Sequence, residues 1–144
     1  MTVKGPHVLL FSEATRLPAC GEPAESRSTH GPNAGRHSSP QSWHFVLRSP
    51  NGHTQLDVAD REEGVSASRL ELLAVVRGLE ALDQPSRVTL VTASRSIQRG
   101  LRFGLEPWRE NGWQWERFGQ MTPIRNADLW QRIDRALAFH EVHC

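Results

Sequence analysis

Residues 43–60 contain two strand-like segments joined by a tight turn, and this hairpin pattern restricts the fold more than any other feature of the chain. Residues 43–48 (Trp-His-Phe-Val-Leu-Arg) are rich in aromatic and branched side chains, and residues 53–60 alternate enough to form a returning strand. Residues 49–52 (Ser-Pro-Asn-Gly) have the composition of a turn. The pattern predicts an antiparallel hairpin.

Three further segments resemble strands. Residues 7–12 (His-Val-Leu-Leu-Phe-Ser) form a short apolar run that follows a Gly-Pro pair, and residues 87–92 (Arg-Val-Thr-Leu-Val-Thr) are largely β-branched. Continuous runs of this length are typical of strands that are buried on both faces. Residues 140–144 provide enough chain for one short final strand.

The clearest helix signal begins at residues 66–68 and ends before Pro85. Ser68 and Glu71 have the spacing of a capping box, in which the two side chains bond to each other's backbone N–H groups. The apolar positions of this helix follow a 3.6-residue period: Leu70, Leu73, Val76 and Leu79.

Two shorter helices are expected further along the chain. Residues 94–101 form the first, which we expect to stop near Gly100 and Gly104. Residues 126–139 form the second, with Asn126 as its cap and an apolar face. The segment between them, residues 103–124, is rich in Trp, Gly and Pro and is expected to protrude from the domain.

The order of these elements predicts a single α/β domain over residues 1–144. An antiparallel hairpin beside strands that are linked by helical crossovers gives a mixed sheet. Residues 14–42 lack apolar periodicity, so we expect a long irregular loop there. A loop of this length inside a compact domain is unusual, and it is either functional or disordered.

Composition excludes several classes of protein. The 144 residues carry a formal net charge of only +1, so no basic tail is available to bind nucleic acid by charge alone. No apolar run approaches the ~20 residues of a membrane span, and no signal-peptide core is present. Cys20 and Cys144 match no metal-finger spacing. We therefore expect a reduced, cytoplasmic protein without a membrane partner.

Several sequence strings resemble those of type 1 ribonuclease H, the family that cuts the RNA strand of RNA–DNA hybrids. Residues 68–72 (Ser-Arg-Leu-Glu-Leu) resemble its N-R-M-E-L, and residues 90–94 (Leu-Val-Thr-Ala-Ser) resemble the strand end that carries T-D-S. Residues 111–113 (Asn-Gly-Trp) are similar to its R-G-W. Residues 123–131 (Pro-Ile-Arg-Asn-Ala-Asp-Leu-Trp-Gln) are similar to its P-V-K-N-x-D-L-W-Q. The resemblance covers residues 8 to about 142. It implies a ribonuclease H-like mixed five-stranded sheet, with helices mainly on one face and the final helix missing.

The resemblance also implies where metal ligands are expected. The family holds two Mg²⁺ ions, roughly 4 Å apart, with four carboxylates. The first falls on Glu13 and the second on Glu71, whereas the third falls on Ala93, which has no ligand atom. The fourth is expected beyond Cys144. We therefore expect Glu13 and Glu71 as the remaining catalytic and metal-binding residues, with weak or absent binding of Mg²⁺ or Mn²⁺.

The resemblance further implies contacts with an RNA–DNA hybrid. The Trp-rich segment resembles the family's basic protrusion, which grips the DNA strand, although three Glu residues reduce its charge here. Aromatic and Arg side chains in alternation suit base stacking and phosphate contact. The candidate nucleic-acid contacts are Ser94, Arg95, Trp108, Arg109, Trp113, Arg125 and Asn126.

Structural roles are the alternative for each of these residues. Glu71 would then belong to a helix cap, Glu13 would be the first solvated residue after a strand, and Ser94 and Asn126 would be helix caps. Of Trp108, Trp113 and Trp115, we expect at least two to belong to the core.

Three functions remain open from the sequence. The favoured one is a non-catalytic module that binds RNA–DNA hybrid or another nucleic acid. The second is a weakly active Mg²⁺-dependent endoribonuclease that uses Glu13 and Glu71. The third is a structural domain that self-associates, because a sheet without its final helix leaves an apolar face for a homodimer.

Overall fold

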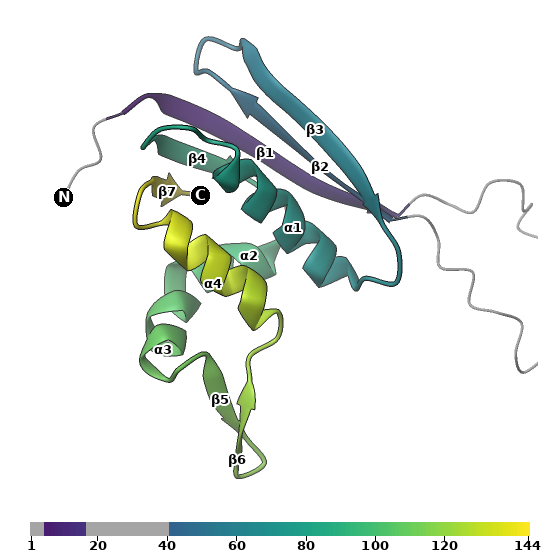
Figure 1. Cartoon of the computed structure of the whole chain (residues 1–144), viewed down its shortest axis with the longest axis vertical. Helices are drawn as coiled ribbons and strands as arrows, with labels where there is room; N and C mark the ends of the chain where they lie inside the picture. Colours follow the sequence, from purple (N-terminus) through teal and green to yellow (C-terminus); the bar gives the residue numbers. More distant parts are fainter. Residues whose placement is uncertain (1–4, 17–40) are drawn as a thin grey trace, which may run out of the picture.

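The computed structural model of the chain describes residues 5–16 and 41–144. Its main feature is a five-stranded sheet with the strand order β3-β2-β1-β4-β7 (Figure 1). Strands β1, β2 and β3 pair antiparallel, whereas β4 and β7 continue the sheet parallel to β1. The strands are β1 (His7–Arg16), β2 (Gln41–Arg48), β3 (Thr54–Glu62), β4 (Arg87–Val91) and β7 (Glu141–His143).

Helices α1 and α4 lie over one face of this sheet (Figure 1). Helix α1 (Ala67–Glu80) packs on β1 and β2, and α4 (Ala127–Ala136) packs beside α1. Gly78 permits the close approach of α1 to β1, since a Cβ atom there would lie 2.5 Å from Cδ1 of Leu10. The mixed five-stranded sheet with helices on one face, as predicted from the sequence, is therefore confirmed.

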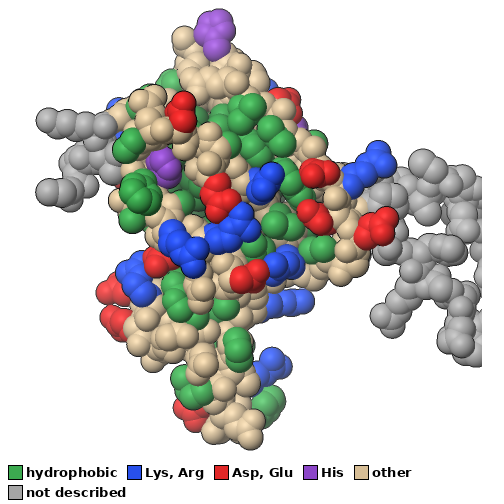
Figure 2. All heavy atoms as spheres, viewed as in Figure 1, with side chains coloured by type: hydrophobic (Ala, Val, Ile, Leu, Met, Phe, Trp, Pro, Cys, Tyr) green, Lys and Arg blue, Asp and Glu red, His purple; other side chains and the backbone are tan. Residues whose placement is uncertain are grey.

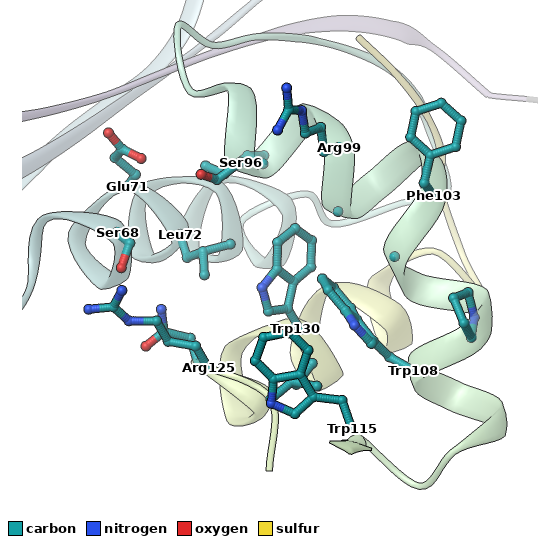
Figure 3. A pocket seen from close by; sticks show the side chains of 16 residues that line it. Ser68, Glu71, Leu72, Ser96, Arg99, Phe103, Trp108, Trp115, Arg125 and Trp130 are labelled. Atoms are coloured by element: carbon teal, nitrogen blue, oxygen red, sulfur yellow. The ribbon is translucent and has the colours of Figure 1, made fainter. Parts of the chain in front are cut away.

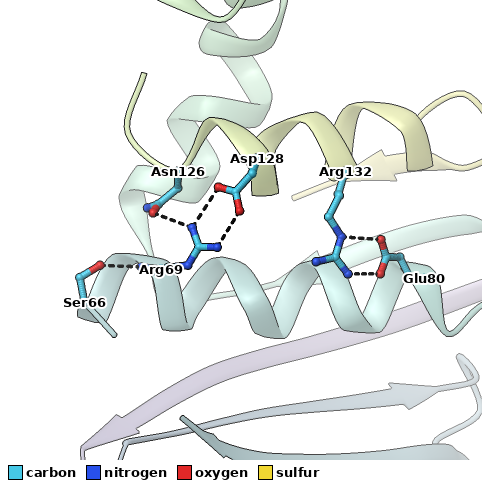
Figure 4. Close-up of polar contacts among 6 residues, drawn as sticks. All are labelled: Ser66, Arg69, Glu80, Asn126, Asp128 and Arg132. Carbon is cyan, nitrogen blue, oxygen red and sulfur yellow. Dashed lines mark hydrogen bonds and ion pairs between the residues drawn. The ribbon is translucent and has the colours of Figure 1, made fainter. Parts of the chain in front are cut away.

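Two ion pairs join α1 to α4 (Figure 4). Nη2 of Arg69 lies 2.6 Å from Oδ2 of Asp128, at the start of both helices. Near the C-terminal end of α1, Nε of Arg132 donates to Oε2 of Glu80 at 2.9 Å. Both pairs contain a guanidinium that makes two bonds to one carboxylate, the geometry that orients two elements best.

A second helical segment begins a few residues after β4 and is itself continuous. Helix α2 (Arg95–Arg99) continues into the π-helical turn η1 (Gly100–Gly104) and then into α3 (Leu105–Glu110). The prediction that the helix stops near its two glycines is wrong. These glycines serve close packing instead, because a Cβ atom on Gly100 would lie 2.2 Å from Cη2 of Trp130.

The chain then forms a small hairpin that projects away from the sheet (Figure 1). Its strands are β5 (Gln114–Arg117) and β6 (Gln120–Pro123). The two residues of its turn, Phe118 and Gly119, have φ angles of +52° and +76°, which define a type I′ turn. Hydrophobic side chains are visible around this projection in Figure 2. The expectation of a protruding segment is consistent with this arrangement.

Three local expectations need correction. Residues 14–16 and 41–42 are not loop, since they extend β1 and β2; the rest of that expected loop lies outside the described residues. The helix cap of α1 is Ser66 rather than Ser68, and its Oγ accepts from the backbone N–H of Arg69 at 3.3 Å. Asn126 stands at the cap position of α4 but makes no side-chain capping bond.

None of the helices within residues 5–16 and 41–144 is long and apolar enough to span a membrane.

Candidate nucleic-acid interface and metal site

Glu13, Glu71 and Ala93 line one pocket of about 260 Å³, together with Ser12, Ala14, Thr92 and Ser94. We call it the strand-end pocket, because it lies where β1 and β4 pass their last parallel register pair, Phe11 with Val91. Helix α1 contributes Glu71 to it. Carboxyl ends of parallel strands are the usual place for ligands in α/β sheets. The three positions that the sequence resemblance singled out therefore do come together.

Glu13 is already engaged by a histidine. Its Oε1 accepts from Nδ1 of His44, its register partner on β2, at 3.1 Å. Nε2 of the same ring lies 2.5 Å from Oδ1 of Asp57 on β3. These hydrogen bonds, first to Asp57 and then to Glu13, raise the pKa of His44 above 6.5. Glu13 is thus held toward the neighbouring strand β2 by its hydrogen bond with His44.

Glu71 is the second carboxylate of the strand-end pocket. It makes no hydrogen bond or ion pair within residues 5–16 and 41–144, so it does not close the predicted capping box. Ser12 beside it is buried, and its Oγ has no hydrogen-bond partner among the described residues. Glu71 and this hydroxyl are therefore the free oxygen donors of the pocket.

These donors do not fit a pair of divalent ions. A hard cation such as Mg²⁺ takes six oxygen ligands, and a pair needs several carboxylates converging between the two ions. The pocket offers Glu71 and a Glu13 that is shared with His44, and Ala93 contributes no ligand atom. In the described part of the chain, no cluster of three or more His, Cys, Asp or Glu side chains is arranged to hold a metal. The expectation of weak metal binding remains a prediction.

Ser94 and Arg95 follow Ala93 at the start of α2. The Oγ of Ser94 accepts from the backbone N–H of Ile97 at 3.3 Å, so this side chain caps the helix. Arg95 is exposed. Of the two roles that the sequence allowed for Ser94, the structure shows the cap.

A larger cavity of about 510 Å³ lies between α1, the α2–α3 helix, the start of α4 and the β5–β6 hairpin (Figure 3). We call it the aromatic cavity, because aromatic rings dominate its walls. The rings are those of Phe103, Trp108, Trp115 and Trp130.

The rim of the aromatic cavity is polar and partly charged. Arg99, the last residue of α2, and Arg125 line it (Figure 3), as does Asn126 at the start of α4. Oδ1 of Asn126 accepts from Nη1 of Arg69 at 3.4 Å, and its backbone has a φ of +58°. Glu71 lines this cavity as well as the strand-end pocket, so the two are neighbours.

Other predicted contacts have structural partners. Nη2 of Arg109 lies 2.5 Å from Oδ1 of Asp134 on α4, so its charge is already balanced. Trp108 packs on Trp130, with ring centroids 5.1 Å apart, and Trp113 is half-buried against the core. Trp115 remains 49 % exposed. Trp108 and Trp113 are therefore partly buried against the core, whereas at least two of the three tryptophans were expected to belong to it.

Three lining or contact residues escaped the sequence reasoning. Phe103 and Arg99 face the aromatic cavity only because the helix continues through its glycines. His44 reaches Glu13 because of the β1–β2 register, which no local pattern reveals. The one sequence feature that pointed to this contact was a histidine in a strand whose two neighbouring strands carry acidic residues.

Comparison with known proteins agrees with this fold. The model of the RNase H family matches residues 30–144. Ribonuclease H of Halorhodospira halophila is 40 % identical over 103 residues, which are 72 % of this chain and 66 % of that protein. Ribonuclease H of Paracoccus denitrificans is 36 % identical over 106 residues, with the same coverage. The chain thus spans just under two thirds of the length of these relatives.

Solved structures show the same fold at lower sequence identity. LC9-RNase H1, a type 1 RNase H with the type 2 active-site motif, superimposes with a TM-score of 0.66 at 22 % identity, covering 99 % of this chain and 63 % of that one. LC11-RNase H1 in complex with RNA/DNA hybrid gives a TM-score of 0.54 at 11 % identity, covering 94 % and 83 %. The fold is therefore that of the ribonuclease H class. The chain itself belongs to the ribonuclease H family and is a type 1 ribonuclease H-like protein.

Proposed function

We propose that this chain binds RNA–DNA hybrid and does not hydrolyse it efficiently. The binding half of the proposal is supported by family membership and by the structural neighbour that was solved with an RNA/DNA hybrid. The observation that carries the second half is Ala93, which stands in the strand-end pocket beside Glu13 and Glu71.

Charge explains why an alanine at this position matters. The reaction class needs cations that stabilise the attacking and leaving oxygens, and each cation needs anionic ligands to hold it. The pocket supplies Glu71 and a Glu13 whose carboxylate is hydrogen-bonded to His44, a histidine whose pKa is raised by its hydrogen bonds with Asp57 and Glu13. Mg²⁺ or Mn²⁺ would have to displace this histidine to use both carboxylates. Binding of either ion is therefore weak in this proposal.

The backbone of the hybrid would be held along the rim of the aromatic cavity. Arg125 carries an exposed guanidinium that makes no ion pair within residues 5–16 and 41–144. Asn126 and the exposed Arg95 are the neighbouring polar contacts, whereas Arg109 is a weaker candidate because Asp134 already pairs with it. Such contacts position a nucleic acid through its phosphates without reading its sequence.

A salt titration of hybrid affinity tests the binding half. Replacing Arg125 with Ala should weaken the binding of any hybrid sequence and reduce the slope of log K against log salt by about 1. Arg135→Ala is the matched control, since Arg135 is equally exposed near the opposite end of α4. Equal losses in both variants would contradict a localised interface.

A weakly active Mg²⁺-dependent endoribonuclease is the second candidate. Ser12 favours it, because its buried Oγ, which has no hydrogen-bond partner in the described part of the chain, adds an oxygen beside Glu13 and Glu71. One ion held by these oxygens and by water would then support slow cleavage. Specific cutting that disappears in Glu71→Gln would favour this candidate over the first.

Self-association remains a third proposal. Val91 on β4 keeps 45 % of its surface exposed, which suits an apolar contact with a second copy. Light scattering at micromolar concentration tests it, and a monomer there would contradict it.

A further inference from the structure

We propose that the aromatic cavity is a receptor for one unpaired nucleotide, with its base between the aromatic rings and its phosphate on the arginine rim. The inference rests on the proposed hybrid-binding function and names the feature of the nucleic acid that this cavity takes. It follows from the shape of the cavity, its ring walls and the charge at its mouth.

The walls offer flat aromatic surface that the protein does not cover. Phe103 is 70 % exposed and Trp115 is 49 % exposed, although both line the cavity. Trp108 and Trp130 form its floor, with ring planes tilted by 58° (Figure 3). Exposing aromatic rings to water costs free energy, and such rings are suited to stacking. Every nucleobase presents a planar face that could stack on them.

Two glycines allow the tryptophan rings of the cavity floor to approach the helix backbone. A Cβ atom on Gly100 would lie 2.2 Å from Cη2 of Trp130, and one on Gly104 would lie 2.6 Å from Cη2 of Trp108. Because neither glycine has a side chain, the outer edges of both indole rings can lie close to the helix backbone, which fixes the position of these two cavity walls.

The mouth of the cavity carries the complementary charge for an anion. Arg99 and Arg125 line it together with the single carboxylate of Glu71, and neither arginine makes an ion pair within residues 5–16 and 41–144. Arg69, Arg109 and Arg132, by contrast, are each paired with a carboxylate. A ligand that combines a planar ring with a negative group fits these walls and this rim together, and a nucleotide has both.

Size and position indicate a single unpaired residue rather than duplex. About 510 Å³ lies in the range of small-molecule sites and is too small for a stacked base pair with its neighbours. A base that enters must leave the helical stack, and the cost is least when it is already unpaired. Since Glu71 lines both the strand-end pocket and the aromatic cavity, a nucleic-acid strand bound across the first would also pass the mouth of the second.

The test compares three hybrids of one sequence: fully paired, with a one-residue abasic bulge, and with a one-residue thymine bulge in the DNA strand. The abasic bulge bends the duplex without offering a base, so it isolates the base itself. The thymine bulge should bind the 144-residue chain about fivefold to a hundredfold more tightly than the abasic bulge, the range of one base–aromatic stack. Trp115→Ala should remove most of this ratio, and Trp115→Phe should restore part of it.

Phe118→Asn is the matched control, because Phe118 is an exposed aromatic residue of the same hairpin that does not line the cavity. It should leave the ratio unchanged. Equal affinity for the two bulges would overturn the inference while paired-hybrid binding still supports the proposed function. Binding of the thymine bulge alone would support the inference and contradict the proposed binding of paired hybrid. Binding of none of the three hybrids would overturn both.

Discussion

Nδ1 of His44 lies 3.1 Å from Oε1 of Glu13, its register partner on the adjacent strand. A carboxylate that the family resemblance assigns to metal binding thus serves as a cross-strand partner of a histidine. Ala93, in the same pocket, contributes no ligand atom. These two facts support the proposal that the pocket binds divalent cations weakly.

Restoring a carboxylate should restore metal affinity. Ala93→Asp adds an oxygen donor beside Glu13 and Glu71, and calorimetry with Mn²⁺ should show an affinity at least about tenfold higher than that of the unmodified chain, because each added charge contact at such distances is worth more than 1 kcal/mol. Ala81→Asp, at the other end of α1, is the control and should change nothing. No gain in Ala93→Asp would mean that the pocket geometry does not suit a cation.

The ion pair between Arg69 and Asp128 should contribute modestly to stability. Asp128→Asn should lower the free energy of unfolding by about 0.5–1 kcal/mol, since the pair is partly exposed. The hydrogen bond from Arg69 lowers the pKa of Asp128 below 3.8. The stabilisation is therefore present above pH 3.8 and is lost as the pH falls through the lower folded-state value. Urea unfolding at pH 7 and pH 3 measures both effects, and a larger difference at pH 3 would contradict this assignment.

His140 should make the fold sensitive to mild acid. Its ring is buried, and Nδ1 accepts from the backbone N–H of Ser86 at 3.1 Å. Burial lowers the pKa of His140 below 6.5. Its contribution is thus present above pH 6.5 and is lost as the pH falls through the folded-state pKa, because the unfolded chain takes the proton more readily. Between pH 7.5 and 5.5, the chain should lose more stability than His140→Asn does, as followed by thermal unfolding.

The turn residue Phe118 should be replaceable with a gain in stability. An aromatic side chain at a φ of +52° is strained, and this one is 94 % exposed, so packing does not offset the strain. Asn is preferred at this position of a type I′ turn, and Phe118→Asn should stabilise the protein by about 0.5–1 kcal/mol. A melting temperature that falls in this variant would show that Phe118 makes a stabilising contact.

Elements that depend on local periodicity could be predicted from the sequence. The hairpin around residues 49–52 and the helix that carries Leu70 and Leu79 were both predicted, because alternation and 3.6-residue spacing are properties of neighbouring residues. The helix across Gly100 was not, since its glycine meets Trp130 from a distant segment.

The candidate site, like the fold, has one part that could be predicted from the sequence and one part that could not. Glu13, Glu71 and Ala93 could be placed together because the family strings align with them and the structure brings them into one pocket. The bond from Glu13 to His44 depends on strand register, and the aromatic cavity depends on how α4 docks beside the α2–α3 helix. Tertiary contacts of this kind leave no periodic trace in a single sequence.

Incubation of the chain with a labelled RNA–DNA hybrid, in Mg²⁺ and then in Mn²⁺, tests the central proposal most directly. At a protein concentration that saturates binding, the hybrid should shift in a gel while its RNA strand stays intact, and Glu71→Gln should behave identically. Site-specific cleavage of the RNA that disappears in Glu71→Gln would contradict the account.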